Sequence, residues 1–120
     1  MNAGMLADLD AMPTPLIASL EKLLDTPRDG ALLRYSLGRE YLKAGDHERA
    51  VAHLREAVRR DPQYSAAWKA LGGALADAQR IDEAREAYAR GIEAARARGD
   101  RQAEKEMTVF ARRLDRPPRA

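Results

Sequence analysis

The two histidines, His47 and His53, are the side chains best suited to bind a metal ion or to exchange a proton near neutral pH. They stand six residues apart within one predicted helix, which places them on opposite faces and excludes a shared metal site. The adjacent glycines Gly72 and Gly73 lie inside a helical pattern, whereas a phosphate-binding loop would stand between a strand and a helix. Neither pattern predicts a metal or a cofactor.

The carboxylates are numerous, but basic side chains stand one helical turn away from them. Glu56 precedes Arg59 and Arg60, and Glu86 precedes Arg90, which is typical of surface pairs worth a few tenths of a kcal/mol each. The chain has no cysteine, which excludes disulfides and thiol catalysis and agrees with a reducing compartment. No apolar run approaches the length of a membrane span, and no secretory signal pattern is present. We therefore expect a non-enzymatic cytoplasmic protein without cofactors.

Charge is distributed unevenly along the 120 residues, although the net charge is only +2. Residues 1–30 carry two basic and five acidic side chains, and residues 96–120 carry eight basic and four acidic ones. The basic end could bind RNA through four arginines, namely Arg112, Arg113, Arg116 and Arg119. Four acidic side chains lie among the eight basic ones of residues 96–120 and no aromatic stacking platform accompanies them, so a solvated terminal helix is favoured and RNA binding is the weaker alternative.

Apolar residues recur at helical spacing through most of the chain, and no strand pattern competes with them. Thr14 followed by Pro15 is typical of a helix start, and Thr26 before Pro27 of a helix end. The predicted organisation is a flexible N-terminus (1–13), one domain (14–116) and a tail (117–120). Within the domain we expect about six helices, arranged as a helix (14–26), two helical hairpins (31–64 and 65–98) and a capping helix (100–115).

The turns inside the two hairpins differ in sequence. Gly45 can adopt the left-handed conformation that closes a helix, and Asp46 can cap the next helix. The second hairpin has Gln79 and Arg80 at the equivalent place, without glycine. A side chain in a left-handed conformation costs roughly 1 kcal/mol, so this second turn is either less tight or slightly strained.

The two hairpins repeat one pattern with a period of 34 residues, which indicates stacked supersecondary units. The repeated positions are Leu37, Gly38, Tyr41, Ala50, Leu54, Ala57 and Pro62 in the first hairpin, and Trp68, Leu71, Gly72, Ala84 and Tyr88 in the second. On these residues the chain resembles the tetratricopeptide repeat (TPR) family, and in particular its small bacterial members. The resemblance implies an all-α fold, a short α-solenoid of antiparallel helix hairpins, with two full repeats between two half-repeats.

Several positions depart from the family pattern, and each departure bears on packing. Arg34 stands where the pattern has tryptophan, and Leu54 stands where it has an aromatic residue. In the second repeat Leu75, Gly91 and Arg96 replace tyrosine, alanine and proline. The small residues that do match, such as Gly38 and Gly72, are expected where the two helices of a hairpin cross.

The resemblance also implies a concave groove that binds an extended peptide or a helix. Carried over residue by residue, the peptide-binding positions are Leu32, Tyr35, Arg39, Leu42, Lys43, Ala66, Lys69, Gly73, Ala76 and Asp77. This groove would be basic through Arg39, Lys43 and Lys69 and roomy beside its small residues, so an acidic-apolar protein segment is the expected partner. The alternative is that these are merely solvated helix residues.

A different function is self-association through the terminal helices. Half-repeats at both ends could leave apolar side chains such as Ile17 or Val109 uncovered, and a second copy could bury them. A homo-oligomer is therefore the alternative to a peptide-binding module. Neither reading involves a membrane.

Overall fold

The computed structural model describes residues 14–116, so the predicted flexible N-terminus and tail lie outside the described residues. The helices follow one another with short connections and run α2 (Pro15–Glu21), α3 (Ala31–Lys43), α4 (His47–Arg60), α5 (Ser65–Asp77), α6 (Ile81–Arg98) and α7 (Arg101–Leu114). Between residues 14 and 116 there is no strand. The prediction of an all-α solenoid of about six helices is confirmed.

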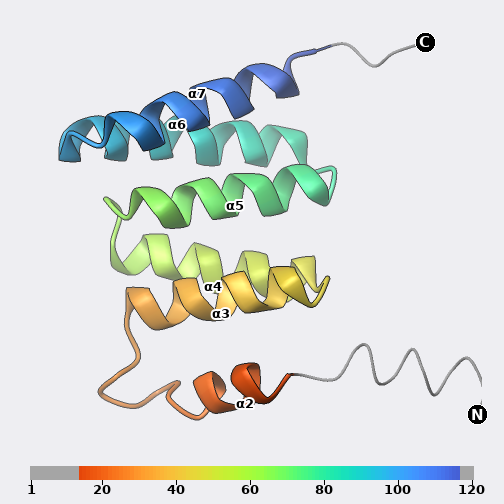
Figure 1. Ribbon diagram of the computed structural model, residues 1–120, viewed down its shortest axis with the longest axis vertical. Helices are drawn as coiled ribbons and strands as arrows, with labels where there is room; N and C mark the ends of the chain where they lie inside the picture. Colours follow the sequence, from red (N-terminus) through yellow and green to blue (C-terminus); the bar gives the residue numbers. More distant parts are fainter. Residues whose placement is uncertain (1–13, 117–120) are drawn as a thin grey trace, which may run out of the picture.

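The helices form two layers that are stacked along one direction (Figure 1). Helices α3, α5 and α7 lie in the front layer of that view, with α4 and α6 behind them. Each helix packs on the next in sequence, and α5 also contacts both α3 and α7 directly. The three front helices therefore form a continuous inner surface, to which both hairpins and the last helix contribute.

Glycines allow the two helices of a hairpin to approach closely. A methyl group on Gly38 would lie 2.5 Å from Cγ of Leu54, and one on Gly72 would lie 2.6 Å from Cδ1 of Tyr88. Both distances are far below van der Waals contact, so no larger residue fits without displacing its neighbour. Gly91, where the family pattern has alanine, has a similar role, because a methyl group there would lie 2.7 Å from Cβ of Trp68.

The buried apolar residues form three clusters in a row. The first joins α2 to the α3–α4 hairpin around Ile17 and Leu37. The second fills the space between the two hairpins around Leu54 and Leu71, and the third joins α6 to α7 around Met107. Since each cluster is built by helices that are neighbours in the stack, the core is extended along the array.

The first helix is shorter than the predicted 14–26. Thr14 caps it by accepting a hydrogen bond from the Ile17 backbone N–H at 3.2 Å, as expected, but the helix ends at Glu21 and continues as turns. The backbone N–H groups of Leu23 and Leu24 donate to carbonyls three residues back, those of Leu20 and Glu21, so the last part of the segment forms tighter turns than an α-helix. These turns end at Asp25, whose φ of +61° leaves the helical region. Its N–H donates to the carboxylate of Asp29 at 3.0 Å, which holds the chain in the turn.

The apolar face of α2 also differs from the prediction. Ile17, expected as a candidate for an uncovered residue, is fully buried against α3. Leu16 is instead 50% exposed, because the short helix turns Ile17 toward the core and Leu16 away from it. Val109 on α7 is 43% exposed, so the expectation for that end agrees with the structure.

The turn between α5 and α6 is tight, so the strained alternative is the one that occurs. Gln79 has a φ of +63°, and the N–H of Arg80 donates to the carbonyl of Leu75 at 2.8 Å. The glycine-containing turn of the first hairpin has the same form, with the N–H of Asp46 donating to the carbonyl of Tyr41 at 2.9 Å. Identical hydrogen bonding thus imposes a left-handed conformation on a glutamine.

Replacing Gln79 with glycine is expected to raise the free energy of unfolding by about 0.5–1 kcal/mol, because the strain removed exceeds the entropy that glycine adds to the unfolded chain. Urea unfolding followed by far-UV circular dichroism measures the change. Gly45→Ala is the matched control and should lower the same quantity by about 1 kcal/mol. A destabilised Gln79→Gly protein would contradict the strain.

Candidate functional site

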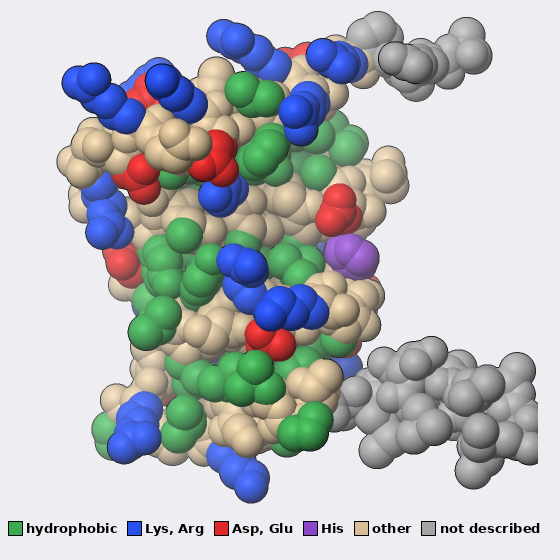
Figure 2. Space-filling view, viewed as in Figure 1, with side chains coloured by type: hydrophobic (Ala, Val, Ile, Leu, Met, Phe, Trp, Pro, Cys, Tyr) green, Lys and Arg blue, Asp and Glu red, His purple; other side chains and the backbone are tan. Residues whose placement is uncertain are grey.

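The inner surface of α3, α5 and α7 contains an open hollow of about 320 Å³, called here the concave hollow. It includes seven of the ten predicted groove residues, namely Tyr35, Arg39, Leu42, Ala66, Lys69, Gly73 and Asp77. Figure 2 shows this face, on which patches of hydrophobic side chains lie among Lys or Arg and Asp or Glu side chains. The periodicity of the repeats thus brings residues of both hairpins to one place.

The other three predicted groove residues lie elsewhere. Leu32 is 68% exposed near the start of α3 and lines no hollow described here. Lys43 lies beside a neighbouring hollow next to α2, and Ala76 is half-buried against the central cluster. Three of the ten predicted groove positions therefore do not line the concave hollow.

Arg39 is held in a defined position by an aromatic neighbour one turn away. Its Nη1 donates to the hydroxyl of Tyr35 at 2.8 Å, and its guanidinium carbon lies 5.7 Å from the centre of that ring. Tyr35 in turn packs on Tyr64, with ring centroids 5.0 Å apart. No carboxylate between residues 14 and 116 forms an ion pair with Arg39. An oriented cation is therefore left available at the edge of the concave hollow.

Lys69, by contrast, is neutralised within the chain. Its Nζ lies 3.0 Å from Oε2 of Glu106 on α7, and Gln102 donates to the other oxygen of that carboxylate at 3.1 Å. The hydrogen bond from Lys69 lowers the pKa of Glu106, so this carboxylate is ionised at neutral pH. Three free cations were expected in the groove, but Lys43 also has a partner, Glu40 at 3.1 Å. The predicted basic flank is reduced to Arg39.

Sequence reasoning missed five residues that line the concave hollow, namely His47, Ala70, Ala74, Glu106 and Phe110. Glu106 and Phe110 stand four residues apart and therefore share one face of α7. Tracing the inner face across three helices, instead of the two within full repeats, would have included them. The half-repeat at the C-terminal end is thus part of the hollow as well as a cap.

A second hollow, of about 380 Å³, lies beside the first and is called here the α2–α3 hollow. It is lined by Leu16, Leu20, Tyr35, Ser36, Arg39, Glu40 and Lys43. Tyr35 and Arg39 line both hollows, so they form the ridge between them. The two hollows are therefore adjacent and share two side chains.

A larger hollow, of about 450 Å³, opens between α4, α5 and α6, with Trp68 and Leu71 in its wall. Its arginines are paired within the chain. Arg55 lies 2.8 Å from a carboxylate oxygen of Glu83, and Arg90 lies 3.6 Å from one of Glu86. Arg59, the third arginine of the wall, pairs with Glu56, so each arginine of this hollow has a carboxylate partner within the chain.

The histidines do not form a site together. His53 stacks on Tyr41, with ring centroids 5.6 Å apart and planes 6° from parallel, whereas His47 borders the concave hollow. Burial lowers the pKa of His53, so its ring is neutral at pH 7. Within residues 14–116 no three side chains of the metal-binding types gather. None of the helices described there is long and apolar enough to cross a membrane.

The basic C-terminal residues lie on the surface at the end of the stack. Arg112, Arg113 and Arg116 are exposed, and Arg113 lies over the ring of Phe110 at 5.6 Å. Arg119 falls outside the described residues. Among the described residues, Asp115 stands between Arg113 and Arg116 in sequence and pairs with Arg85 at 3.0 Å, so the basic surface is interrupted by a carboxylate.

Two stacked helix hairpins with a hollow across their inner helices define a short helical-repeat module. Comparison with known proteins gives the family. The model of the tetratricopeptide repeat matches residues 35–100, and the chain belongs to that family. It is 54% identical over 101 residues to the TPR repeat-containing protein PA0015 of Pseudomonas aeruginosa, a match that covers 84% of this chain and 96% of the relative.

Solved structures agree with this assignment. Protein BPP2914 from Bordetella parapertussis is 42% identical, with a TM-score of 0.72 over 84% of this chain and 88% of that one. The Sgt2 TPR domain from Aspergillus fumigatus is 26% identical, with a TM-score of 0.66 over 99% of this chain and 81% of that one. Proteins of this family are generally non-enzymatic interaction modules, and the fold of this chain is that of a protein–protein interaction module.

Proposed function

We propose that this chain is a non-enzymatic cytoplasmic module that binds an acidic-apolar peptide or helix in the concave hollow. The observation that carries the proposal is Arg39, a cation oriented by Tyr35 and without a carboxylate partner among the described residues. It stands beside an apolar surface that includes Leu42 and Phe110, with space above Gly73. One charged contact next to an apolar recess is the chemistry by which such grooves select a segment.

Arg39 would both neutralise a carboxylate of the partner and fix its orientation. A guanidinium can donate two parallel hydrogen bonds to one carboxylate, and such charge-assisted pairs are the stronger class of hydrogen bond. Lys69 contributes less, because a partner would have to compete with Glu106 for it. An apolar side chain of the partner would then fit between Ala66 and Phe110, where the small residues of α5 leave room.

Reversing the charge of Arg39 is expected to weaken partner binding at least tenfold, because a charge-assisted pair contributes about 1.5–3 kcal/mol. The partner is first identified by capture from lysate and mass spectrometry, and its segment is then titrated calorimetrically against wild type and Arg39→Glu. Lys105→Glu on the exposed side of α7 is the matched control and should bind as wild type does. Equal affinities for all three proteins would refute the groove assignment.

Self-association through the terminal helices is the second candidate. It is favoured by the exposure of Leu16 and Leu32 near one end of the stack and of Val109 at the other. Burial of such side chains against a second copy would stabilise a dimer by roughly 25 cal/mol for each Å² of apolar surface removed from water. A sedimentation coefficient that does not change with protein concentration would exclude it.

A further inference from the structure

We propose that residues 1–12 of this chain bind in the α2–α3 hollow of the same molecule and there cover Arg39. The segment would then be an internal competitor for the partner described above, so the inference rests on the proposed function and concerns its regulation. The occupant is the chain's own N-terminal segment, which suits the hollow by its chemistry, its composition and its place in the chain.

The first observation is the chemistry of the α2–α3 hollow. Its apolar wall comes from Leu16 and Leu20 of α2, and Leu16 is half exposed although it is a large aliphatic residue. On the α3 side the hollow contains Arg39, together with Lys43 and Glu40, which neutralise each other at 3.1 Å. The hollow therefore offers apolar surface and one uncompensated positive charge.

The second observation is the composition of the segment. Residues 1–12 contain two carboxylates, Asp8 and Asp10, and no lysine or arginine. Apolar side chains alternate with these carboxylates, from Met5 and Leu6 to Leu9. An acidic-apolar segment of this kind matches the charge and the polarity of the hollow, and it is the same chemistry that the proposed partner requires.

The third observation is proximity along the chain. The segment joins the described structure at Thr14, two residues before Leu16, which itself lines the hollow. Twelve residues span up to about 40 Å when extended, so the segment can turn back over α2 and reach α3. A tethered segment has an effective concentration of roughly a millimolar, which favours it over a second copy of the chain at micromolar concentration.

Binding of the segment would affect the concave hollow because Tyr35 and Arg39 line both hollows. A partner that needs Arg39 must first displace Asp8 or Asp10. The apparent affinity for the partner is then reduced by the fraction of molecules in which the segment is bound. Removing the acidic charges of the segment should accordingly strengthen partner binding, whereas removing Arg39 should weaken it.

The absence of cysteine makes a direct test possible. A nitroxide attached to Gly4→Cys should abolish most of the amide signal intensity of Tyr35, Ser36 and Arg39 in a heteronuclear NMR spectrum. Amides on the outer face of α6, such as that of Arg90, should keep theirs. Adding Asp8→Lys and Asp10→Lys to the labelled chain should restore at least half of the lost intensity, and so should Arg39→Glu. Lys105→Glu should restore none.

A mixed sample distinguishes binding of the chain's own segment from binding of a second copy. Isotope-labelled chain without nitroxide is combined with nitroxide-labelled chain of natural isotope abundance, and the inference requires that the signals of α3 stay unchanged. Loss of intensity in that sample would assign the hollow to a second copy and overturn the inference, as would unchanged loss after reversal of both aspartates or no loss at all. These outcomes leave the partner titration untouched, so each proposal can fail alone.

Discussion

Gly72→Ala is expected to lower the free energy of unfolding by about 2 kcal/mol, whereas Gly73→Ala, one residue further on, should raise it by about 0.5–1 kcal/mol. The added methyl group at position 72 would lie 2.6 Å from Cδ1 of Tyr88, whose ring is buried in the third cluster and has little space to move. At position 73 the nearest atom is the Tyr88 hydroxyl at 3.8 Å, an ordinary contact. Overpacking therefore dominates at the first site and helix propensity at the second.

Chemical denaturation of the two variants and of wild type measures both changes, and the slope against urea should be the same for all three. The two substitutions add the same methyl group to the same helix, so their difference isolates the contact with Tyr88. If Gly72→Ala were as stable as Gly73→Ala, the α5–α6 crossing would not be as close as described.

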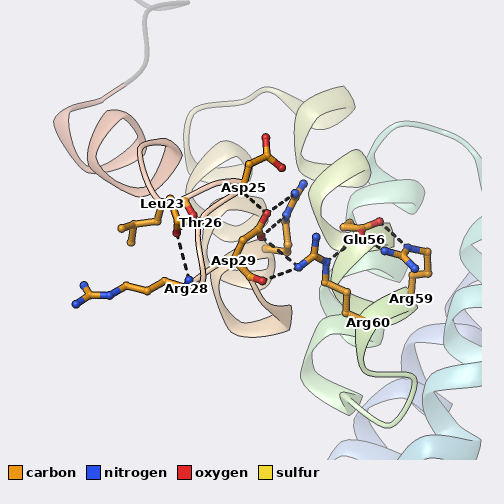
Figure 3. Close-up of polar contacts among 9 residues, drawn as sticks. Leu23, Asp25, Thr26, Arg28, Asp29, Glu56, Arg59 and Arg60 are labelled. Atoms are coloured by element: carbon orange, nitrogen blue, oxygen red, sulfur yellow. Dashed lines mark hydrogen bonds and ion pairs between the residues drawn. The ribbon is translucent and has the colours of Figure 1, made fainter.

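Asp29→Ala is expected to lower the free energy of unfolding by about 2–3 kcal/mol, although the residue lies in a loop. Its carboxylate is only 4% exposed and accepts two hydrogen bonds from Arg34, both at 2.9 Å, besides the backbone bond from Asp25. Figure 3 shows Arg60 facing the same carboxylate, with Glu56 beyond it. Removing Asp29 leaves the mostly buried guanidinium of Arg34 without a counter-charge, which costs more than the loss of a surface pair.

Asp82→Ala is the matched control. Asp82 also pairs with an arginine, Arg85 at 3.4 Å, but its side chain is 98% exposed, so its removal should change the free energy of unfolding by less than about 0.5 kcal/mol. Thermal and urea unfolding at neutral pH give both values. A small effect at Asp29 would show that the buried network adds nothing beyond what an exposed pair adds.

The same network makes stability depend on pH in the acidic range. Hydrogen bonds from Arg34 hold the pKa of Asp29 well below its ordinary value of 3.8, and Arg59 and Arg60 lower the pKa of Glu56 from 4.5 to about 2. In this range the unfolded chain binds more protons than the folded one. The stabilisation is therefore complete above about pH 4.5 and falls as the pH drops toward 2. Between pH 7 and pH 3 the free energy of unfolding should therefore fall less for Asp29→Ala than for wild type, and urea unfolding at the two pH values measures both changes.

Much of the fold could be predicted because its determinants are local or periodic. The 34-residue repeat places Gly38 and Gly72 at equivalent positions, and the helix limits at Thr14 and Asp46 are visible as capping residues. The turn at Gln79 was recognised but its form was left open, because the sequence does not state whether surrounding packing is strong enough to impose the left-handed conformation.

The candidate site was less predictable because its charges are settled by contacts between units. The sequence predicts a free cation at Lys69, but the partner of Lys69, Glu106, stands 37 residues away in a half-repeat with weak register. Likewise, Arg34 stands where the family pattern has tryptophan, and the repeat pattern does not predict its ion pair with Asp29 in the loop before α3. Repeat positions indicate which side chains share a face, and they do not indicate which of those side chains neutralise one another.

Because its buried residues form a row of three small clusters, the molecule has no single central core. Asp29 stabilises the N-terminal end of the stack and Gly72 the C-terminal half, and these two residues share no side-chain partner. Damage at the two places should therefore be nearly independent, with the effect of a double substitution close to the sum of the single ones. We therefore expect that one end of the array can loosen while the far end keeps its packing.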